Sequence, residues 1–302
     1  MDCLALRDGL FFGNQVVSGL ATGGVYALVA LGLVLIYKAT QVVNFAQGDL
    51  LLLGAYVGWA LTSVGLPFPV AFSLTLVLAA AGGLAVERLI LRRMIGSPLI
   101  AVIIVTLGLS SMLRGVVFLV AGTEVRRFPE DVFGGPPVEV GPVLVPQIHA
   151  WALAIAAAAV AVLALFFRYS RQGVALRAAA DDQQAAMSMG IRISRTFALS
   201  WGLSASVAAI GGILLGNLSG VNFTLADLGQ QVFPVAILGG LDSLAGAIVG
   251  GLLIGVLQNV ASGYVDPCVG GGLRDVVPFF ALVVILMVRP RGLFGRAQIE
   301  RV

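Results

Sequence analysis

The sequence predicts an all-α protein built as a polytopic bundle of membrane-spanning helices. Of its 302 residues, 59% are hydrophobic and only 11% are charged. Soluble domains carry roughly 25% charged residues, so this chain could not cover a water-facing surface with polar groups. Long apolar runs also recur along the chain, and most approach the roughly 20 residues that a spanning helix needs. We therefore expect residues 1–302 to form a single transmembrane domain.

Eight apolar runs account for most of the expected membrane crossings. They lie near residues 11–37, 49–64, 68–91, 98–121, 147–168, 195–217, 245–263 and 272–289. The first run is longer than a straight crossing requires, which favours a tilted helix or one that begins in the interface. The second run is short, which favours a start inside the bilayer. Pro67 and Pro69 separate it from the third run.

The arginines predict which side of the membrane each loop faces, because cytoplasmic loops carry an excess of basic residues. Twelve of the 17 arginines lie in three segments, residues 88–97, 168–195 and 289–301, which we assign to the cytoplasm. The 122–146 loop has four acids against two arginines, so we assign it to the opposite side. The acids are Glu124, Glu130, Asp131 and Glu139. With these assignments the amino terminus lies outside and the carboxyl terminus lies in the cytoplasm.

The same assignments require one more crossing than the eight runs provide. The loop after residue 217 and the loop at 264–271 both fall outside, so an even number of crossings must separate them. Only 245–263 is available as a full span. The missing crossing is expected at 227–240, which is too short for a straight spanning helix. We interpret it as a half-helix. On this count the chain crosses nine times, and we expect about eight to nine crossings with the half-helix included.

Two interruptions, at 38–49 and 218–246, break the apolar pattern in the two halves of the chain. Backbone leaves a helix at membrane depth only where protein or a water-filled cavity satisfies its polar groups. Paired breaks indicate a transport route, although an interfacial loop is the other interpretation of each. The polar residues expected to line the route are Asn44, Gln47 and Asp49 at the first break and Asn217, Asn222, Gln230 and Gln231 at the second.

Two charged residues near these breaks each have more than one interpretation. Asp49 lies where a helix restarts, so it either caps the free N–H groups of the first turn or belongs to the route. Arg114 lies about eight residues inside its helix end, roughly 12 Å by helix rise. Its side chain either extends to the outer interface or pairs with a carboxylate, such as that of Asp49 or of a substrate.

The stretch 168–196 is longer than a loop that only connects two helices. The sequence DDQQAAMSMG within it predicts a short helix. Asp181 is expected to be its N-cap, Gln184 the third position of a capping box, and Gly190 its end. Its small and flexible apolar residues suit docking into a groove of another protein. The alternative is a helix lying on lipid headgroups. The residues assigned to this surface are Arg177, Asp181, Asp182, Gln184, Ala185, Ala186, Met189 and Gly190.

Missing motifs exclude several classes of protein. Lys38 is the only lysine, so the sequence has no G-x-x-x-x-G-K-[ST] phosphate loop and the chain does not hydrolyse nucleotide by itself. No cluster has metal-ligand spacing, and no nucleophile–base pair indicates an enzyme. The basic residues do not gather on a face for nucleic acid. An ion-coupled secondary transporter using Asp49 or Asp227 stays open as an alternative, as does a passive channel.

The glycines and the cysteines lead to two further predictions, one on helix packing and one on disulfide bonding. Glycines recur four residues apart, as in Gly19-x3-Gly23 and Gly251-x3-Gly255. This spacing lets helix backbones approach closely, and the contacts either pack the bundle or slide during gating. Cys3 and Cys268 lie at opposite ends of the chain, and we expect no disulfide between them.

Five stretches, in order along nearly the whole chain, resemble the permease subunits of high-affinity branched-chain amino acid importers of the ATP-binding-cassette (ABC) class. The similarity is to the first, H-type permease. The stretches are GGVYALVALGLVLIYKATQVVNFAQGDLLLLGAY (23–56), ERLILRRM (87–94), RYSRQGVALRAAADDQQAAMSMGI (168–191), VFPVAILGGLDSLAGAIVGGLLIGVLQN (232–259) and RPRGLFGR (289–296). The motif NFAQGD at 44–49 stands where this family has Asn-Phe-Ala, a His or Gln, Gly and an acid.

This resemblance implies a type II ABC-importer-like permease in the bacterial inner membrane. The 168–196 segment would be the coupling helix that inserts into an ATP-hydrolysing partner. The implied partners are a second homologous permease, two cytoplasmic ATP-binding subunits, a periplasmic substrate-binding protein and membrane lipid. ATP and Mg would bind the partner subunits, with no cofactor on this chain. The family also includes carriers of urea, short amides and aromatic or other carboxylic acids.

Overall fold

The computed structural model describes residues 9–129, 132–140 and 143–295 of the chain. Five residues that the sequence predictions used lie outside the described residues: Cys3, Glu130, Asp131, Arg296 and Arg301.

The described part of the chain is almost entirely helical. Its longer helices are α1 (Gly9–Thr40), α2 (Gln47–Ser63), α3 (Phe68–Leu89), α4 (Leu99–Ala121), α5 (Gln147–Tyr169), α8 (Ile193–Ser219), α11 (Leu244–Val269) and α12 (Leu273–Val288). Its short elements are η1 (Leu91–Met94), α6 (Arg171–Asp181), α7 (Gln183–Ser188), α9 (Thr224–Gln230), α10 (Val232–Gly239), β1 (Val138–Val140) and β2 (Val143–Val145). β1 and β2 pair antiparallel. All eight predicted apolar runs are helices, so the all-α prediction is confirmed.

Among the described residues, six helices are long and apolar enough to cross a membrane: α1, α3 continued by η1, α4, α5, α8 and α11. α2 and α12 have 17 and 16 residues, slightly fewer than the roughly 20 of a straight crossing. The half-helix expected at 227–240 is present as two short helices, α9 and α10, which meet at Gln231. The chain is therefore a multi-pass helical membrane protein.

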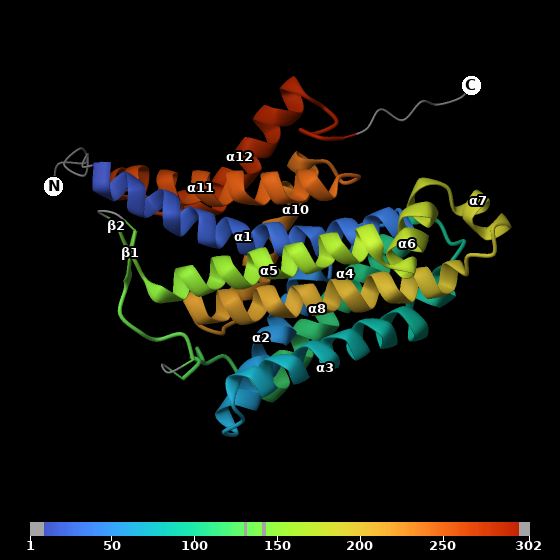
Figure 1. The fold of residues 1–302 in the computed structure, drawn as a ribbon, viewed down its shortest axis with the longest axis horizontal. Helices are drawn as coiled ribbons and strands as arrows, with labels where there is room; N and C mark the ends of the chain where they lie inside the picture. Colours follow the sequence, from blue (N-terminus) through green and yellow to red (C-terminus); the bar gives the residue numbers. More distant parts are fainter. Residues whose placement is uncertain (1–8, 130–131, 141–142, 296–302) are drawn as a thin grey trace.

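The long helices run mainly along the long axis of the molecule (Figure 1). The β1–β2 hairpin lies at one end of this axis, and α6 and α7 lie at the other (Figure 1). α5 connects the two ends, and its 23 residues span about 35 Å. The described parts of the 122–146 loop and the arginine-rich 168–195 segment therefore lie at opposite ends of a helix long enough to span a membrane.

α1 and α8 form the centre of the bundle. Nearly all of the apolar part of α1 is buried, and the helix packs against α11, α8 and α5. Its contact with α11 depends on glycine. A Cβ atom added to Gly19 would lie 2.7 Å from the Val256 Cα, and one added to Gly23 would lie 2.8 Å from the Gly251 carbonyl oxygen. The predicted role of these glycines in close helix packing is confirmed.

α3, α4 and α5 form the periphery, although they are as apolar as the central helices. Only 17 to 22% of their most apolar stretches are buried. Large side chains such as Ile104, Leu119 and Val162 lie exposed on them. Apolar side chains on the outside of a membrane bundle face lipid or another subunit.

Candidate translocation site and coupling segment

The first break spans residues 41–46, and it folds back into the bundle. α1 ends at Thr40, where Gln41 takes a left-handed conformation with φ 57°. The side-chain amide of Gln47, at the start of α2, donates to the Val29 carbonyl oxygen at 3.5 Å. Val29 lies 11 residues before the end of α1, about 16 Å by helix rise. α2 therefore begins deep in the bundle, as its short apolar run predicted.

Asn44 and Gln47 hold this break by bonding to each other and to α8. The Asn44 Nδ2 donates to the Gln47 Oε1 at 3.2 Å, and the Asn44 Oδ1 accepts from the Ala46 N–H at 3.0 Å. The Ser204 hydroxyl donates to the same Gln47 Oε1 at 3.0 Å. Both side chains are 0% exposed. In this conformation their polar atoms form hydrogen bonds with other groups of the chain and do not face an open cavity.

Asp49 lies in the first turn of α2, but of its two interpretations, capping of the free N–H groups is not the observed one. Both of its carboxylate oxygens are held by α4 instead. The Arg114 Nε donates to the Asp49 Oδ1 at 3.0 Å, and the Ser110 hydroxyl donates to the Asp49 Oδ2. Of the two interpretations of Arg114, pairing with a carboxylate is therefore the observed one. The sequence did not indicate Ser110, although it lies one helical turn before Arg114 on the same face.

The second break lies against the first. A Cβ atom on Gly48 would clash with the Ala226 carbonyl oxygen, and one on Gly229 would clash with the Gly48 backbone. The Phe45 and Phe233 rings stack with centroids 5.1 Å apart. Segments about 180 residues apart in the chain therefore meet at one place in the bundle.

α9, within the second break, has one polar face and one buried face. Thr224, Asp227 and Gln230 recur every three residues and are exposed. Ala226 and Gly229 are buried on the other side, against α2. The Asp227 carboxylate accepts from Arg114 Nη1 at 3.4 Å, so Arg114 joins the acids of both breaks.

Gln231 lies at the bend between α9 and α10 and is buried. Its Oε1 accepts from the Tyr26 hydroxyl at 3.2 Å and from the Gln258 Nε2 at 2.8 Å, and its Nε2 donates to the Asp275 Oδ1 at 2.8 Å. Helices α1, α11 and α12 thus converge on this amide. Sequence reasoning missed Tyr26, Gln258 and Asp275. Gln258 carried a detectable signal, because it is an uncharged amide inside an apolar run.

The two asparagines predicted at the second break, Asn217 and Asn222, are not joined to this cluster by any bond among the described residues. Asn217 is half-buried near the end of α8, and its Nδ2 has no hydrogen-bond partner in the described part of the chain. The Asn222 Oδ1 accepts from the Thr224 N–H at 2.9 Å and so starts α9 locally.

The 168–196 segment contains two helices, α6 and α7, rather than one. The N-cap of α7 is Asp182, whose Oδ1 accepts from the Gln184 N–H at 2.8 Å and the Ala185 N–H at 3.0 Å. The assignment of Asp181 as N-cap was wrong, because α6 continues to Asp181 and the chain first becomes extended at Asp182. Gln184 is therefore the second helical residue, not the third, and the predicted capping box is absent.

The other residues that the sequence assigned to the docking surface include both exposed and buried side chains. Gly190 follows α7 with φ +83°, as expected for its end. Met189 is 84% exposed and Ala185 and Arg177 are also exposed, so all three are accessible to a partner. Ala186 is only 4% exposed, so it packs inside the chain.

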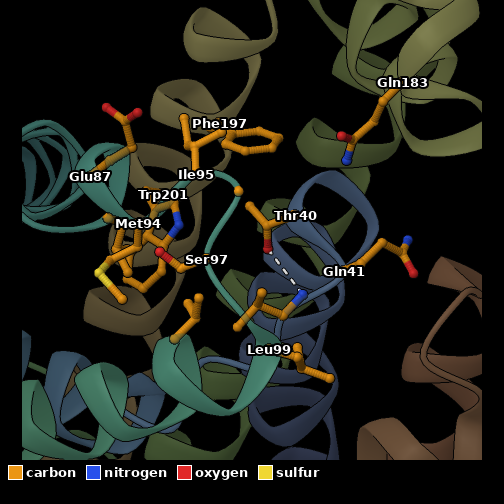
Figure 2. Close-up of a pocket in the computed structure, with 14 residues that line it drawn as sticks. Thr40, Gln41, Glu87, Met94, Ile95, Ser97, Leu99, Gln183, Phe197 and Trp201 are labelled. Carbon is orange, nitrogen blue, oxygen red and sulfur yellow. Dashed lines mark hydrogen bonds between the residues drawn. The ribbon is translucent and has the colours of Figure 1, made fainter.

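The 168–196 segment contacts the chain just before the first break. The Gln183 Nε2, in α7, donates to the Ala39 carbonyl oxygen at 3.0 Å. A cavity of about 240 Å³ lies beside this contact. Figure 2 shows Gln183 on one side of it, Thr40 and Gln41 at the end of α1, and Phe197 and Trp201 from α8. A movement of α7 would therefore reach the last turn of α1 directly.

A third side of this cavity carries a buried acid. Glu87, at the end of α3, is 1% exposed. It accepts from the Arg92 Nε at 3.1 Å and the Arg92 Nη2 at 2.8 Å, in a bidentate pair. In the part of the chain that the structure describes, no three acidic, histidine or cysteine side chains form a metal-binding group.

Comparisons with known proteins show the family of the chain. The family described as "Branched-chain amino acid transport system / permease component" matches residues 15–288. The chain is 32% identical to the high-affinity branched-chain amino acid transport system permease protein LivH of Escherichia coli strain K12, covering 97% of this chain and 98% of LivH. It is 31% identical to the corresponding permease protein BraD of Pseudomonas aeruginosa, covering 96% and 97%.

A solved structure supports the fold alone. PsaBC from Streptococcus pneumoniae, determined in complex with a Fab, matches 94% of this chain and 94% of its own with a TM-score of 0.50 and 15% sequence identity.

Proposed function

Because the chain belongs to the branched-chain amino acid transport permease family, we propose that it passes branched-chain amino acids, or a related small polar solute, into the cytoplasm. It is a transmembrane permease subunit of an ABC importer, and its activity is transport rather than catalysis. The observation that carries the proposed route is the contact between the two helix breaks. A permease for urea, short amides or carboxylic acids is the alternative within the same importer class.

The proposed route follows the two breaks. Gln230 and Asp227 present polar groups on the outside of α9, and Asn222 lies just before them. Asn44, Gln47 and Gln231 act behind this surface, since they hold the breaks in place through buried hydrogen bonds. Asn217, whose amide nitrogen is buried, would join the route only after α8 moves. Asp49 acts through Arg114.

Proposed coupling begins at the cytoplasmic side. The permease works with ATP-binding and substrate-binding components, as its family implies. We assign it one further permease and two ATPases, with ATP and Mg on the ATPases. Closure of the ATPases would push α7, and the Gln183–Ala39 contact would pass this movement to the first break. The amino terminus lies outside and the carboxyl terminus in the cytoplasm, according to the arginine distribution.

Purification followed by transport measurement tests the function. The complex would be isolated from its native membrane in mild detergent, reconstituted in liposomes, and assayed for uptake of L-leucine with its binding protein. ATP-dependent uptake, together with recovery of a second permease and two ATPases, is the expected result. Uptake by the chain alone without ATP would contradict it and favour an ion-coupled transporter. ATP-dependent uptake of urea or an amide, but not leucine, would favour the alternative solute.

Replacing Met189 by arginine tests the docking surface. The exposed thioether is expected to contact an ATPase groove, so Met189→Arg should weaken the association by about 30-fold, the effect of losing a contact of roughly 2 kcal/mol. Co-purification of the ATPases measures this. Val64→Arg is the matched control, because Val64 is 83% exposed, is also apolar, and lies outside both residues 168–196 and the cavity beside α7. Intact association in Met189→Arg would show that α7 lies elsewhere, such as on lipid.

A further inference from the structure

The charges around Arg114 do not balance. The Asp49 side chain is 2% exposed, and its two carboxylate oxygens accept hydrogen bonds from the Arg114 Nε and the Ser110 hydroxyl. Asp227 is 63% exposed and lies 3.4 Å from Arg114 Nη1. Two carboxylates therefore share one guanidinium, which leaves one negative charge at the accessible side. A partly exposed ion pair of this length contributes little by itself, so either partner can exchange it for a ligand.

Arg114, the cation of this pair, lies within the apolar span of α4, where a charged side chain is costly against lipid. Arg114 is seven residues before Ala121, the end of α4, which places it about 10 Å inside. Ionisable side chains at such depth face the bundle interior or a water-filled cavity. Thr224 and Gln230 extend the polar face of α9 on either side of Asp227. The exposed side of this pair therefore belongs to an aqueous route or to the junction with another subunit.

Two aromatic rings lie next to the charged pair. Phe118 is four residues after Arg114 in α4, and Phe223 is four residues before Asp227, at the N-cap of α9. Residues four apart share one helix face. The Phe118 and Phe223 ring centroids are 5.8 Å apart, so both helices place a ring on the same side of their charge. The result is a cation, an anion and an apolar surface within one small area.

We infer that Arg114, Asp227, Phe118 and Phe223 form a transient site for a zwitterionic α-amino acid with an apolar side chain. The solute ammonium pairs with Asp227, its carboxylate with the outer nitrogens of Arg114, and its side chain lies against the two rings. A zwitterion supplies both charges at the spacing of one Cα, whereas a neutral amide such as urea supplies neither. The inference rests on the proposed function and names the solute class at the junction of the two breaks.

The test uses the complete complex in liposomes, with its binding protein and L-leucine as the probe. Asp227→Asn keeps the shape of the side chain and removes its charge, and it leaves the Asp49–Arg114 pair intact. We expect kcat for uptake to fall about tenfold or more, since a hydrogen bond to a charged group is lost. KM for the loaded binding protein should stay unchanged, because that protein captures the solute first. Asp227→Glu should recover part of the rate.

Two further variants complete the experiment. Phe118→Ala removes one ring while all charges remain, and uptake of leucine should fall more than uptake of alanine. Glu124→Gln is the matched control, because it removes an exposed acid that pairs with Arg126 in the outer loop. Uptake by Glu124→Gln should equal that of the unaltered complex.

Each other outcome overturns the inference. Unchanged kcat in Asp227→Asn would show that the solute does not contact this carboxylate. Loss of subunit co-purification in Asp227→Asn would show that Asp227 binds the neighbouring permease instead. Absence of ATP-dependent leucine uptake in the unaltered complex would reject the proposed function itself, which is a separate failure.

Discussion

The two helix breaks carry similar polar residues but use them differently. At the first break, Asn44 and Gln47 are fully buried and their bonds go to one another, to the backbone and to α8. At the second break, α9 keeps Asp227 and Gln230 exposed and buries Ala226 and Gly229. At the first break the polar side chains stabilise the fold, whereas at the second break α9 exposes polar side chains on the surface. A break in an apolar sequence therefore indicates where a chain leaves its helix, but not whether its polar residues face a route.

The contact between the breaks should be the most sensitive feature. Gly48→Leu places a side chain where even a Cβ atom would clash with the Ala226 backbone. We expect destabilisation at or beyond the ~3 kcal/mol upper range of overpacking, and thus little folded protein. Yield and thermal unfolding in detergent measure this. Gly115→Leu is the control, since no other described atom lies within 4 Å of its added Cβ. Equal stability of both variants would contradict the packed contact.

The second break should depend strongly on Gln231. Gln231→Leu leaves Tyr26, Gln258 and Asp275 without their shared amide. The buried Tyr26 hydroxyl then loses this acceptor, whereas Asp275 is exposed to solvent and the Gln258 Nε2 still donates to the Arg274 carbonyl oxygen. An unsatisfied buried group costs about 1–3 kcal/mol, so the midpoint of thermal unfolding should fall clearly. Gln230→Leu is the neighbouring control because Gln230 is exposed, and surface changes usually stay within about 0.5 kcal/mol. A larger loss in Gln230→Leu than in Gln231→Leu would reverse the assignment of buried and exposed roles.

The first break should show an effect of comparable size from the same substitution. Gln47→Leu removes the acceptor for Asn44 and Ser204, while its own donor bond to Val29 is long at 3.5 Å. We expect a loss of about 1–3 kcal/mol, with uptake per folded molecule unchanged. A Ser204→Ala change in the Gln47→Leu background should add little, because the two side chains share one bond. A large additive loss would show that Ser204 has another role.

Local errors in the sequence predictions have a common cause. Asp181 and Asp182 are adjacent and chemically identical, and either could cap α7. The choice depends on where α6 ends, which follows from its contacts with α5 and α1. A cap on its own helix was one of the two interpretations of Asp49, because a first-turn acid favours that role. Its actual partners lie 61 and 65 residues away on α4, a distance that local pattern cannot detect.

The sequence by itself determined the membrane class, the approximate ends of the long helices and the positions of both breaks. These properties follow from hydropathy, proline and charge, which act over about 20 residues or fewer. Only the tertiary structure decided that Gly48 meets Gly229, that Arg114 joins the acids of both breaks, and that Gln47 is sealed while Asp227 is exposed. Such pairings depend on which helix faces fit together, because apolar helices in lipid gain little from hydrophobicity and are selected by close packing and polar contacts.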